Sequence, residues 1–262
     1  MKNRLLNIYS FGIFAFLYLP ILILVIFSFN QDKFNSSWGG FSTEWYIKLL
    51  NNSELLESFQ VSFTIALFSA FISTIIGTLA AYGFYKKSFF GTSKIKTLVN
   101  LPIITPDIIL GLGLLIFFVS INFTLGYYSI LLAHITFNIS YTTLIVLTRF
   151  SNFNSNIENA AKDLGASNFK SFVFIILPNI FPGILVSFLI AFTLSWDDFI
   201  ISFFTSGVGT TTLPVRVYSM IKMGVNPQIN AISTITLVIT IITILIASKF
   251  QNISKIINSK SL

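Results

Sequence analysis

Hydrophobic and polar positions alternate in long blocks along this chain. Runs rich in Phe, Ile, Leu and Val are separated by shorter segments that carry Lys, Asp, Asn and Gly. Four charge-sparse tracts cover about residues 8–29, 58–84, 99–148 and 174–248, and a polar section interrupts the last one. Because roughly 20 apolar residues in a helix cross the ~30 Å hydrocarbon core of a bilayer, each tract is long enough to span a membrane.

Two of these tracts are too long for a single crossing. No charge lies between Asp107 and Arg149, and at ~1.5 Å per residue one helix of that length would be roughly twice as long as the bilayer is thick. We expect a turn at 122–126 in the third tract and a break around 197–227 in the fourth. The sequence therefore predicts an all-α membrane protein, a single transmembrane domain over 1–262 with six spans near 8–29, 58–84, 104–121, 128–148, 176–195 and 229–248.

Composition agrees with this membrane class. Hydrophobic residues make up 54% of the chain and charged residues 10%, and the mean hydropathy is +0.84. There is no Cys, which removes thiol nucleophiles, thiolate metal sites and disulfides. Lys2 and Arg4 precede a charge-free run over 5–31, which is longer than the apolar region of a signal peptide and lacks a small-x-small cleavage site. We expect this run to be retained as a signal anchor.

The placement of the basic residues predicts the orientation. With the N-terminus inside, both termini are cytoplasmic, and twelve of the 16 Lys and Arg residues fall on the cytoplasmic side. They are Lys2, Arg4, Lys86, Lys87, Lys94, Lys96, Arg149, Lys162, Lys170, Lys249, Lys255 and Lys260. Most acids, in contrast, fall outside or at the outer interface. The net charge of +7 thus reflects topology, which excludes nucleic acid as a partner.

One cytoplasmic loop, 149–175, is polar on a helical pattern. Ser155 and Glu158 fit an S-x-x-E capping box, so a helix is expected to start there. Its apolar positions recur at i, i+3, i+4 and i+7 and form one narrow stripe of Ile157, Ala160, Ala161 and Leu164.

The end of that helix is marked as clearly as its start. Gly165 predicts a C-terminal stop, Ser167 can cap a second helix, and Pro178 is expected to start the next span. Two short helices should therefore meet at a Gly elbow. The small Ala side chains suit docking into a groove of a partner protein, whereas an ordinary amphipathic loop on lipid headgroups fits the same periodicity. The pattern leaves both interpretations open.

The stretch ENAAKDLGASNFKSFVFIILP resembles the EAA loop of ABC-importer permeases, whose pattern is E-A-A, three residues, Gly, nine residues and I-x-L-P. Asn159 stands where the family has Glu, and Glu158 stands one place earlier. The positions that match in register are Ala160, Ala161, Gly165, Ile175, Leu177 and Pro178. Further stretches, among them WGGFSTEWY, TPDIIL and FTLSWDDFIISFFTSG, resemble the permeases of spermidine/putrescine importers.

This resemblance implies a small type I ABC-importer permease fold. It also implies a transport subunit of the bacterial inner membrane that works with a second homologous permease, a cytoplasmic ATP-binding subunit dimer and a periplasmic or surface solute-binding protein. ATP and Mg would be bound by the partner ATPase and no cofactor by this chain. The residues that would couple the loop to the ATPase are Glu158, Asn159, Ala160, Ala161, Asp163, Gly165 and Ala166.

Three acids are candidates for a cation path. Asp107 begins the third span, and Asp197 and Asp198 end the fifth. Asp107 could simply cap a helix N-terminus, and the Asp pair could mark a solvated helix end. Alternatively, carboxylates between apolar walls could line a route for a polycation, because each interacts more strongly there than in water.

The outer aromatic residues and the single His are each open to more than one interpretation. Trp45 and Tyr46, with Trp38 nearby, could anchor the outer interface, contact an ammonium group or dock a binding protein. His134 is expected to be a hydrogen-bonded packing residue rather than a metal or proton site. Arg149 suits the C-terminus of its helix.

Three function classes compete. The chain has no G-x-x-x-x-G-K-[ST] phosphate loop, so any use of ATP requires a partner. A secondary carrier with Asp107 and His134 as proton relays would leave the coupling-loop pattern unexplained. An intramembrane enzyme lacks a nucleophile and base pair in a motif. We therefore expect a non-enzymatic permease subunit of an ATP-driven importer for polyamines or another small organic solute.

Overall fold

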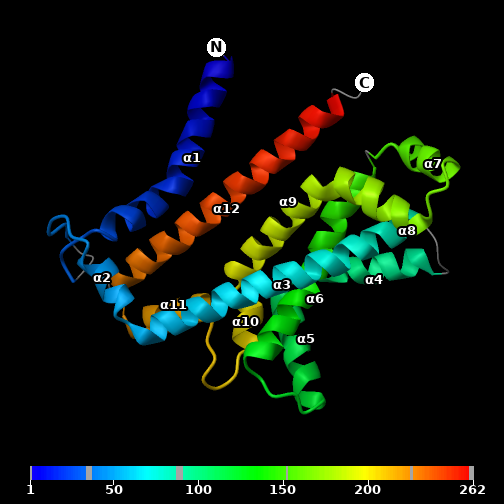
Figure 1. Ribbon diagram of the computed structural model, residues 1–262. Coiled ribbons are helices and arrows are strands. Elements are labelled where there is room, and N and C mark those ends of the chain that lie inside the picture. The colour runs from blue at the N-terminus through cyan, green and yellow to red at the C-terminus, as the bar shows by residue number, and fades with distance from the viewer. Residues whose placement is uncertain (1, 34–36, 87–90, 152, 225–226, 260–262) are drawn as a thin grey trace. The chain divides into compact units, whose positions relative to one another are not determined.

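The computed structural model describes residues 2–33, 37–86, 91–151, 153–224 and 227–259. Within these ranges the chain is helical, and the pairing of Asn30 with Phe41 is an isolated bridge. The elements, in chain order (Figure 1), are α1 Lys2–Phe27, α2 Glu44–Leu50, α3 Ser53–Lys86, α4 Thr92–Ile104, α5 Asp107–Ser120, α6 Tyr127–Phe150, α7 Ser155–Asp163, α8 Asn168–Ser171, the π-helix η1 Phe172–Ile176, α9 Leu177–Trp196, α10 Ile200–Thr205, α11 Leu213–Met223 and α12 Pro227–Ser259.

Five described helices are long and apolar enough to cross a membrane, and a sixth crossing exists if α4 and α5 together form one. The five are Tyr9–Phe27, Ser53–Lys86, Tyr127–Phe150, Asn168–Trp196 and Pro227–Phe250. These helices coincide along the chain with five of the six predicted spans, and their bounds as membrane crossings stay predictions. The turn expected at 122–126 is also present, with Asn122 in the left-handed region at φ 54°.

The predicted third span, 104–121, is not one straight helix. α4 and α5 meet at an angle of 111°, and α5 by itself has 14 residues, about 21 Å at 1.5 Å per residue. The cause is local. Pro106 excludes Thr105 from helical geometry, and both residues are extended, with ψ 130° and 137°. The helix therefore restarts at Asp107 rather than at residue 104.

Pro178 lies in the first turn of α9, as predicted for a helix that starts there, but α9 continues directly from the helical segment before it. Helical structure runs from Asn168 to Trp196 and passes through the π-helix η1 just before the proline. Pro178 has no N–H to donate to the carbonyl of Phe174, and the adjacent Leu177 N–H bonds to the carbonyl of Phe172, five residues back. The wider π turn lets the helix continue through the proline.

The described contacts group into two compact units. Unit 1 comprises Met1–Ser58 and Val215–Ile239, and unit 2 comprises Phe59–Pro214 and Thr240–Leu262. In unit 1 the Asn30 side chain accepts from Gly39 N–H and donates to the Ser37 carbonyl, each at 2.8 Å, and Arg216 pairs with Glu54. The single-domain interpretation of 1–262 stays a prediction.

Unit 2 is held together by close helix contacts along α3. Ser69, Ser73, Gly77 and Ala81 recur every four residues and place small side chains on one face. A Cβ added at Gly77 would lie 2.1 Å from Oγ1 of Thr142 on α6, so the two backbones approach too closely for any larger residue. The Thr142 hydroxyl lies 2.9 Å from the Ser73 carbonyl oxygen across this contact.

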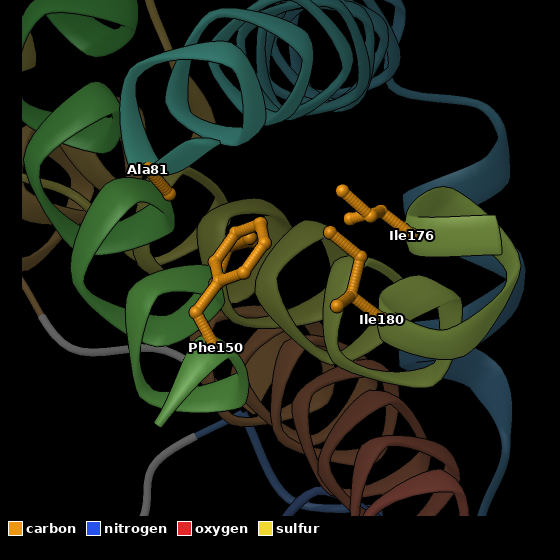
Figure 2. Close-up of a cluster of buried hydrophobic side chains, with 5 residues drawn as sticks. Ala81, Phe150, Ile176 and Ile180 are labelled. Atoms are coloured by element: carbon orange, nitrogen blue, oxygen red, sulfur yellow. The ribbon is translucent and has the colours of Figure 1, made fainter. Parts of the chain in front are cut away.

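Two buried hydrophobic clusters complete unit 2. One joins α3, α6, η1 and α9 through Ala81, Val146, Phe150, Ile176 and Ile180, and Figure 2 shows the Phe150 ring and the two Ile side chains within it. The other joins α5, α6 and α10 through Phe118, Ala133, Phe137 and Ile201. The first cluster lies beside the polar loop, and the second beside the acidic residues.

Candidate functional site

The polar loop forms the predicted pair of short helices, α7 and α8, joined at Gly165. Gly165 has φ 88°, its N–H bonds to the Lys162 carbonyl, and Ala166 N–H bonds to the Ala161 carbonyl, each at 2.9 Å. This is a Schellman ending, which needs a left-handed residue at the Gly position. Ser167 caps α8 by accepting from Lys170 N–H at 3.3 Å. The predicted elbow is confirmed.

The apolar stripe of α7 faces outward in this chain. Ile157 is 47% exposed and Leu164 90% exposed, and Ala160 between them is also exposed. Burying such a stripe is what normally fixes an amphipathic helix to its own protein. The stripe of α7 is therefore free for another partner.

Glu158 lies on another side of α7 and points inward. Its side chain is 3% exposed and its carboxylate pairs with Lys86 of α3 and, at 2.8 Å, with Lys162 of α7. Burial alone would raise the pKa of Glu158, but hydrogen bonds and charge from the two lysines outweigh it and lower the pKa below its ordinary value. The same contacts raise the pKa of Lys162.

The expected capping box at Ser155 and Glu158 is wrong. Asn154 is the N-cap of α7 and accepts from Asn156 N–H at 3.0 Å. A carboxylate that pairs with two ammonium groups gains more than one that bonds a neutral amide, so the Glu158 side chain turns to the lysines.

The remaining coupling candidates lie on or near the exposed side. Asn159, Asp163 and Gly165 are exposed, and Ala161 and Ala166 are half-buried. Sequence reasoning missed Lys86 and the two rings beneath it, Tyr82 and Tyr85, because they are distant from the loop along the chain. Only the positive charge at the end of α3 was available as a signal.

Two of the three predicted path acids line the same pocket. Asp107 and Asp198 border a cavity of about 90 Å³ together with Pro102, Phe137, Tyr141, Leu194 and Ile201. This volume is large enough for several water molecules. Two carboxylates and two aromatic rings in one small cavity form a site able to hold an ammonium group.

Asp198 is also part of a buried hydrogen-bonded network. Its carboxylate accepts from Ser202 N–H at 2.7 Å and lies 3.3 Å from Nε2 of His134. Nδ1 of His134 lies 2.6 Å from the Ser195 hydroxyl, and Nε2 lies 3.0 Å from the Ser202 hydroxyl. His134 is 1% exposed, which confirms the prediction of a hydrogen-bonded packing residue. Asp198 thus precedes α10, accepts hydrogen bonds from backbone N–H groups in that helix, and also lines the pocket.

The other three path candidates lie elsewhere. Asp197 accepts from the Thr240 hydroxyl at 3.0 Å and does not line the pocket. In unit 1, the buried Trp45 donates its indole N–H to the Asn30 carbonyl at 2.8 Å, and the Lys48 ammonium lies over its ring at 4.4 Å. The Tyr46 hydroxyl lies 2.7 Å from that of Ser28. Their roles in a substrate path stay predictions.

Among the described residues, no three His, Cys, Asp or Glu side chains are grouped as a metal ion would require. Instead, the polar side chains within each site bind one another. At α7 these are Lys86, Lys162 and Glu158, and at α10 they are the His, Ser and Asp side chains around His134. Their geometry suits an electrostatic link and a cation pocket respectively.

Comparison with known proteins places these features in a family. The family model described as binding-protein-dependent transport system inner membrane component matches residues 73–260, which include α7 and the acidic pocket. The spermidine/putrescine transport system permease protein PotC of Haemophilus influenzae is 40% identical over 241 residues, 92% of this chain and 94% of that protein. The putrescine transport system permease protein PotI of Escherichia coli is 42% identical over 231 residues, 86% of this chain and 82% of that protein.

Solved structures show the same fold at low sequence identity. A bacterial ABC transporter involved in the import of the acidic polysaccharide alginate superposes with a TM-score of 0.72 and 15% identity, over 97% of this chain and 94% of that chain. The MetNI methionine ABC transporter in an inward-facing conformation gives 0.58 and 16%, over 79% and 96%. The chain belongs to the family of binding-protein-dependent transport system inner membrane components and is a multi-pass membrane subunit of a transporter.

Proposed function

We propose that this chain is a permease subunit of an ATP-driven polyamine importer in the bacterial inner membrane. It forms the translocation path with a second homologous permease, and α7 docks into a cytoplasmic ATP-binding subunit dimer that holds ATP and Mg. Both termini are cytoplasmic, and a periplasmic or surface solute-binding protein delivers spermidine or putrescine. The names and 40–42% identity of the relatives PotC and PotI support the substrate class. The alternative cargo is another small organic solute.

The observation that carries this proposal is the orientation of α7. Its apolar stripe faces away from the chain while its acid is buried against α3. A loop that rests on lipid headgroups needs large apolar side chains and basic residues at its polar face, whereas this stripe has two Ala residues at its centre. A small, exposed apolar surface on a well-capped helix suits a groove in another protein.

The mechanism that follows is alternating access. ATP binding closes the paired ATPase subunits, and the docked α7 helices transmit that movement to the spanning helices. The cavity at Asp107 and Asp198 then opens to one side of the membrane at a time. An ion-gradient carrier differs in a simple way, because its uptake would persist without any ATPase subunit.

Docking can be tested at Ala160, in the centre of the exposed stripe. Ala160→Trp should lower substrate-stimulated ATPase activity and polyamine uptake by roughly tenfold, because a 1 Å misplacement of coupled parts has effects of this size or larger. Reconstituted complexes in liposomes provide both measurements. Ala160→Ser, which keeps the side chain small, is the matched control and should retain activity. Normal ATP-driven uptake by the Trp variant would refute docking through this stripe.

The polycation path can be tested at Asp107, which is exposed at the start of α5. Asp107→Asn should lower spermidine uptake about tenfold, the effect of losing ~1.4 kcal/mol from a charge-assisted contact, without lowering thermal stability. Asp198→Asn should lower both uptake and stability, because Asp198 also holds Ser202 and His134. Glu57→Gln, an exposed acid outside the pocket, is the control. If Asp107→Asn and Asp198→Asn take up spermidine as fast as the Glu57→Gln control, the acidic-path proposal is wrong.

A further inference from the structure

Lys86, the last residue of α3, contacts a carboxylate that lies 72 residues further along the chain. That carboxylate, on Glu158, is 3% exposed, and Lys86 itself is 25% exposed. Both Lys86 and Lys162 approach the same oxygen, Oε1. Lys162 belongs to α7 itself, so its ion pair with Glu158 joins two residues of the same helix. Lys86 belongs to a spanning helix and therefore joins two elements.

The surroundings of Lys86 hold its ammonium group in place. Nζ lies 5.4 Å from the ring centroid of Tyr85 and 5.8 Å from that of Tyr82, within the range of cation–π attraction. Those rings are themselves packed, Tyr85 on Phe150 at 4.6 Å and Tyr82 on Phe172 at 4.5 Å between centroids. The ammonium thus lies between a buried carboxylate and an aromatic surface built from α3, α6 and η1.

A contact of this kind resists sliding. Apolar surfaces tolerate small displacements, whereas an ion pair with little water around it is directional, and moving Lys86 away leaves the buried carboxylate with the Lys162 ammonium alone. The apolar stripe of α7 faces outward and does not fix α7 against α3. The Lys86–Glu158 pair does.

We propose that Lys86 is a positioning residue that fastens the coupling helix α7 to the cytoplasmic end of α3. Movement imposed on α7 by a docked ATPase is then passed to a spanning helix instead of being lost by bending of the loop. This inference rests on the proposed function. It also assigns separate roles to two neighbours: Glu158 binds inward to α3, and the exposed Asn159 is left for the partner.

The experiment uses the complete transporter, with its partner permease, ATPase subunits and binding protein, reconstituted in liposomes. Uptake of radiolabelled spermidine and hydrolysis of ATP are measured on the same preparation, and their ratio reports coupling. Lys86→Met and Glu158→Gln should each lower uptake per ATP by roughly tenfold while ATP hydrolysis continues. Lys162→Met is the matched control, because it removes the other lysine from the same carboxylate, and its ratio should stay within about twofold of wild type.

A charge exchange separates a specific link from a general structural effect. The double variant with Lys86→Glu and Glu158→Lys keeps two cations around one anion and should recover uptake per ATP relative to either single exchange. An unchanged ratio in Lys86→Met, an equal loss in Lys162→Met, or no recovery in the double variant would overturn the inference. If Lys86→Met does not assemble, the double variant compared with Glu158→Lys alone supplies the test. A wild-type complex that takes up spermidine without ATP would instead refute the proposed function.

Discussion

Glu158 illustrates how one side chain changes its role with its surroundings. Its position beside the Ala pair suggests an acid exposed to a partner, yet its carboxylate is buried between Lys86 and Lys162. Two ammonium groups compensate the desolvation of one carboxylate, and the pKa falls below the ordinary value despite the burial that opposes it. Asp198 is likewise held by its neighbours, because its carboxylate lies 3.3 Å from Nε2 of His134 and accepts from Ser202 N–H.

The lowered pKa of Glu158 predicts a pH dependence of stability. Because the folded-state pKa lies below the unfolded value, the pair contributes fully above that unfolded value, near the ordinary 4.5, and loses its contribution as pH falls through the lowered folded pKa. Glu158→Gln mimics the protonated side chain at every pH. We expect wild type to unfold at a higher temperature than Glu158→Gln at pH 7 and the gap to close in acid. Thermal unfolding of the detergent-solubilised complex measures this, and a gap that widens on acidification would contradict the assignment.

For the individual helices, the positions along the chain were predicted more accurately than the helix ends and bends. The elbow at Gly165 and Ser167 is correct because both signals act within a few residues. The capping box failed because a distant lysine competed for Glu158. The bend before Asp107 and the π turn before Pro178 both arise from proline, whose missing N–H can either break a helix or be absorbed by a wider turn.

Replacing a glycine by Ala should have different effects on stability at two positions, one inside the contact between α3 and α6 and one outside it. Gly77→Ala should destabilise the protein by about 1–3 kcal/mol, because its Cβ would overlap Oγ1 and Cβ of Thr142 and approach the Thr143 backbone. Gly113→Ala, in α5 with nothing within 4 Å of its added Cβ, should be neutral or stabilising by roughly 0.5–1 kcal/mol. Thermal unfolding of both variants tests this pair. Equal effects would mean that α3 and α6 are not closely packed at Gly77.

At the scale of the whole molecule, function depends on which loops face which side of the membrane. The coupling loop must be cytoplasmic if it meets an ATPase, and the segment between α10 and α11 must then face outward. Leu164 is 90% exposed in the first, and Val208 is fully exposed in the second. Both lie at surface positions where a substitution disturbs no packing.

The absence of Cys makes this topology directly measurable. Leu164→Cys should react with a membrane-impermeant maleimide only when the cytoplasmic face is opened, and Val208→Cys should react from outside in intact cells. The wild-type chain, which has no thiol, provides the background. Reaction of Leu164→Cys in intact cells would reverse the orientation and remove α7 from any cytoplasmic ATPase.

The membrane class, the approximate spans and the elbow could be predicted from local sequence, because hydropathy, Gly and Ser act through neighbouring residues and through the thickness of the bilayer. The exposed face of α7, the contact of Lys86 with Glu158 and the cavity shared by Asp107 and Asp198 became known from the folded structure alone. These depend on residues far apart in the chain, whose approach is set by helix packing at positions such as Gly77 and Thr142. Local sequence does not show which distant residues helix packing brings together, so the partner of each charged side chain could not be predicted.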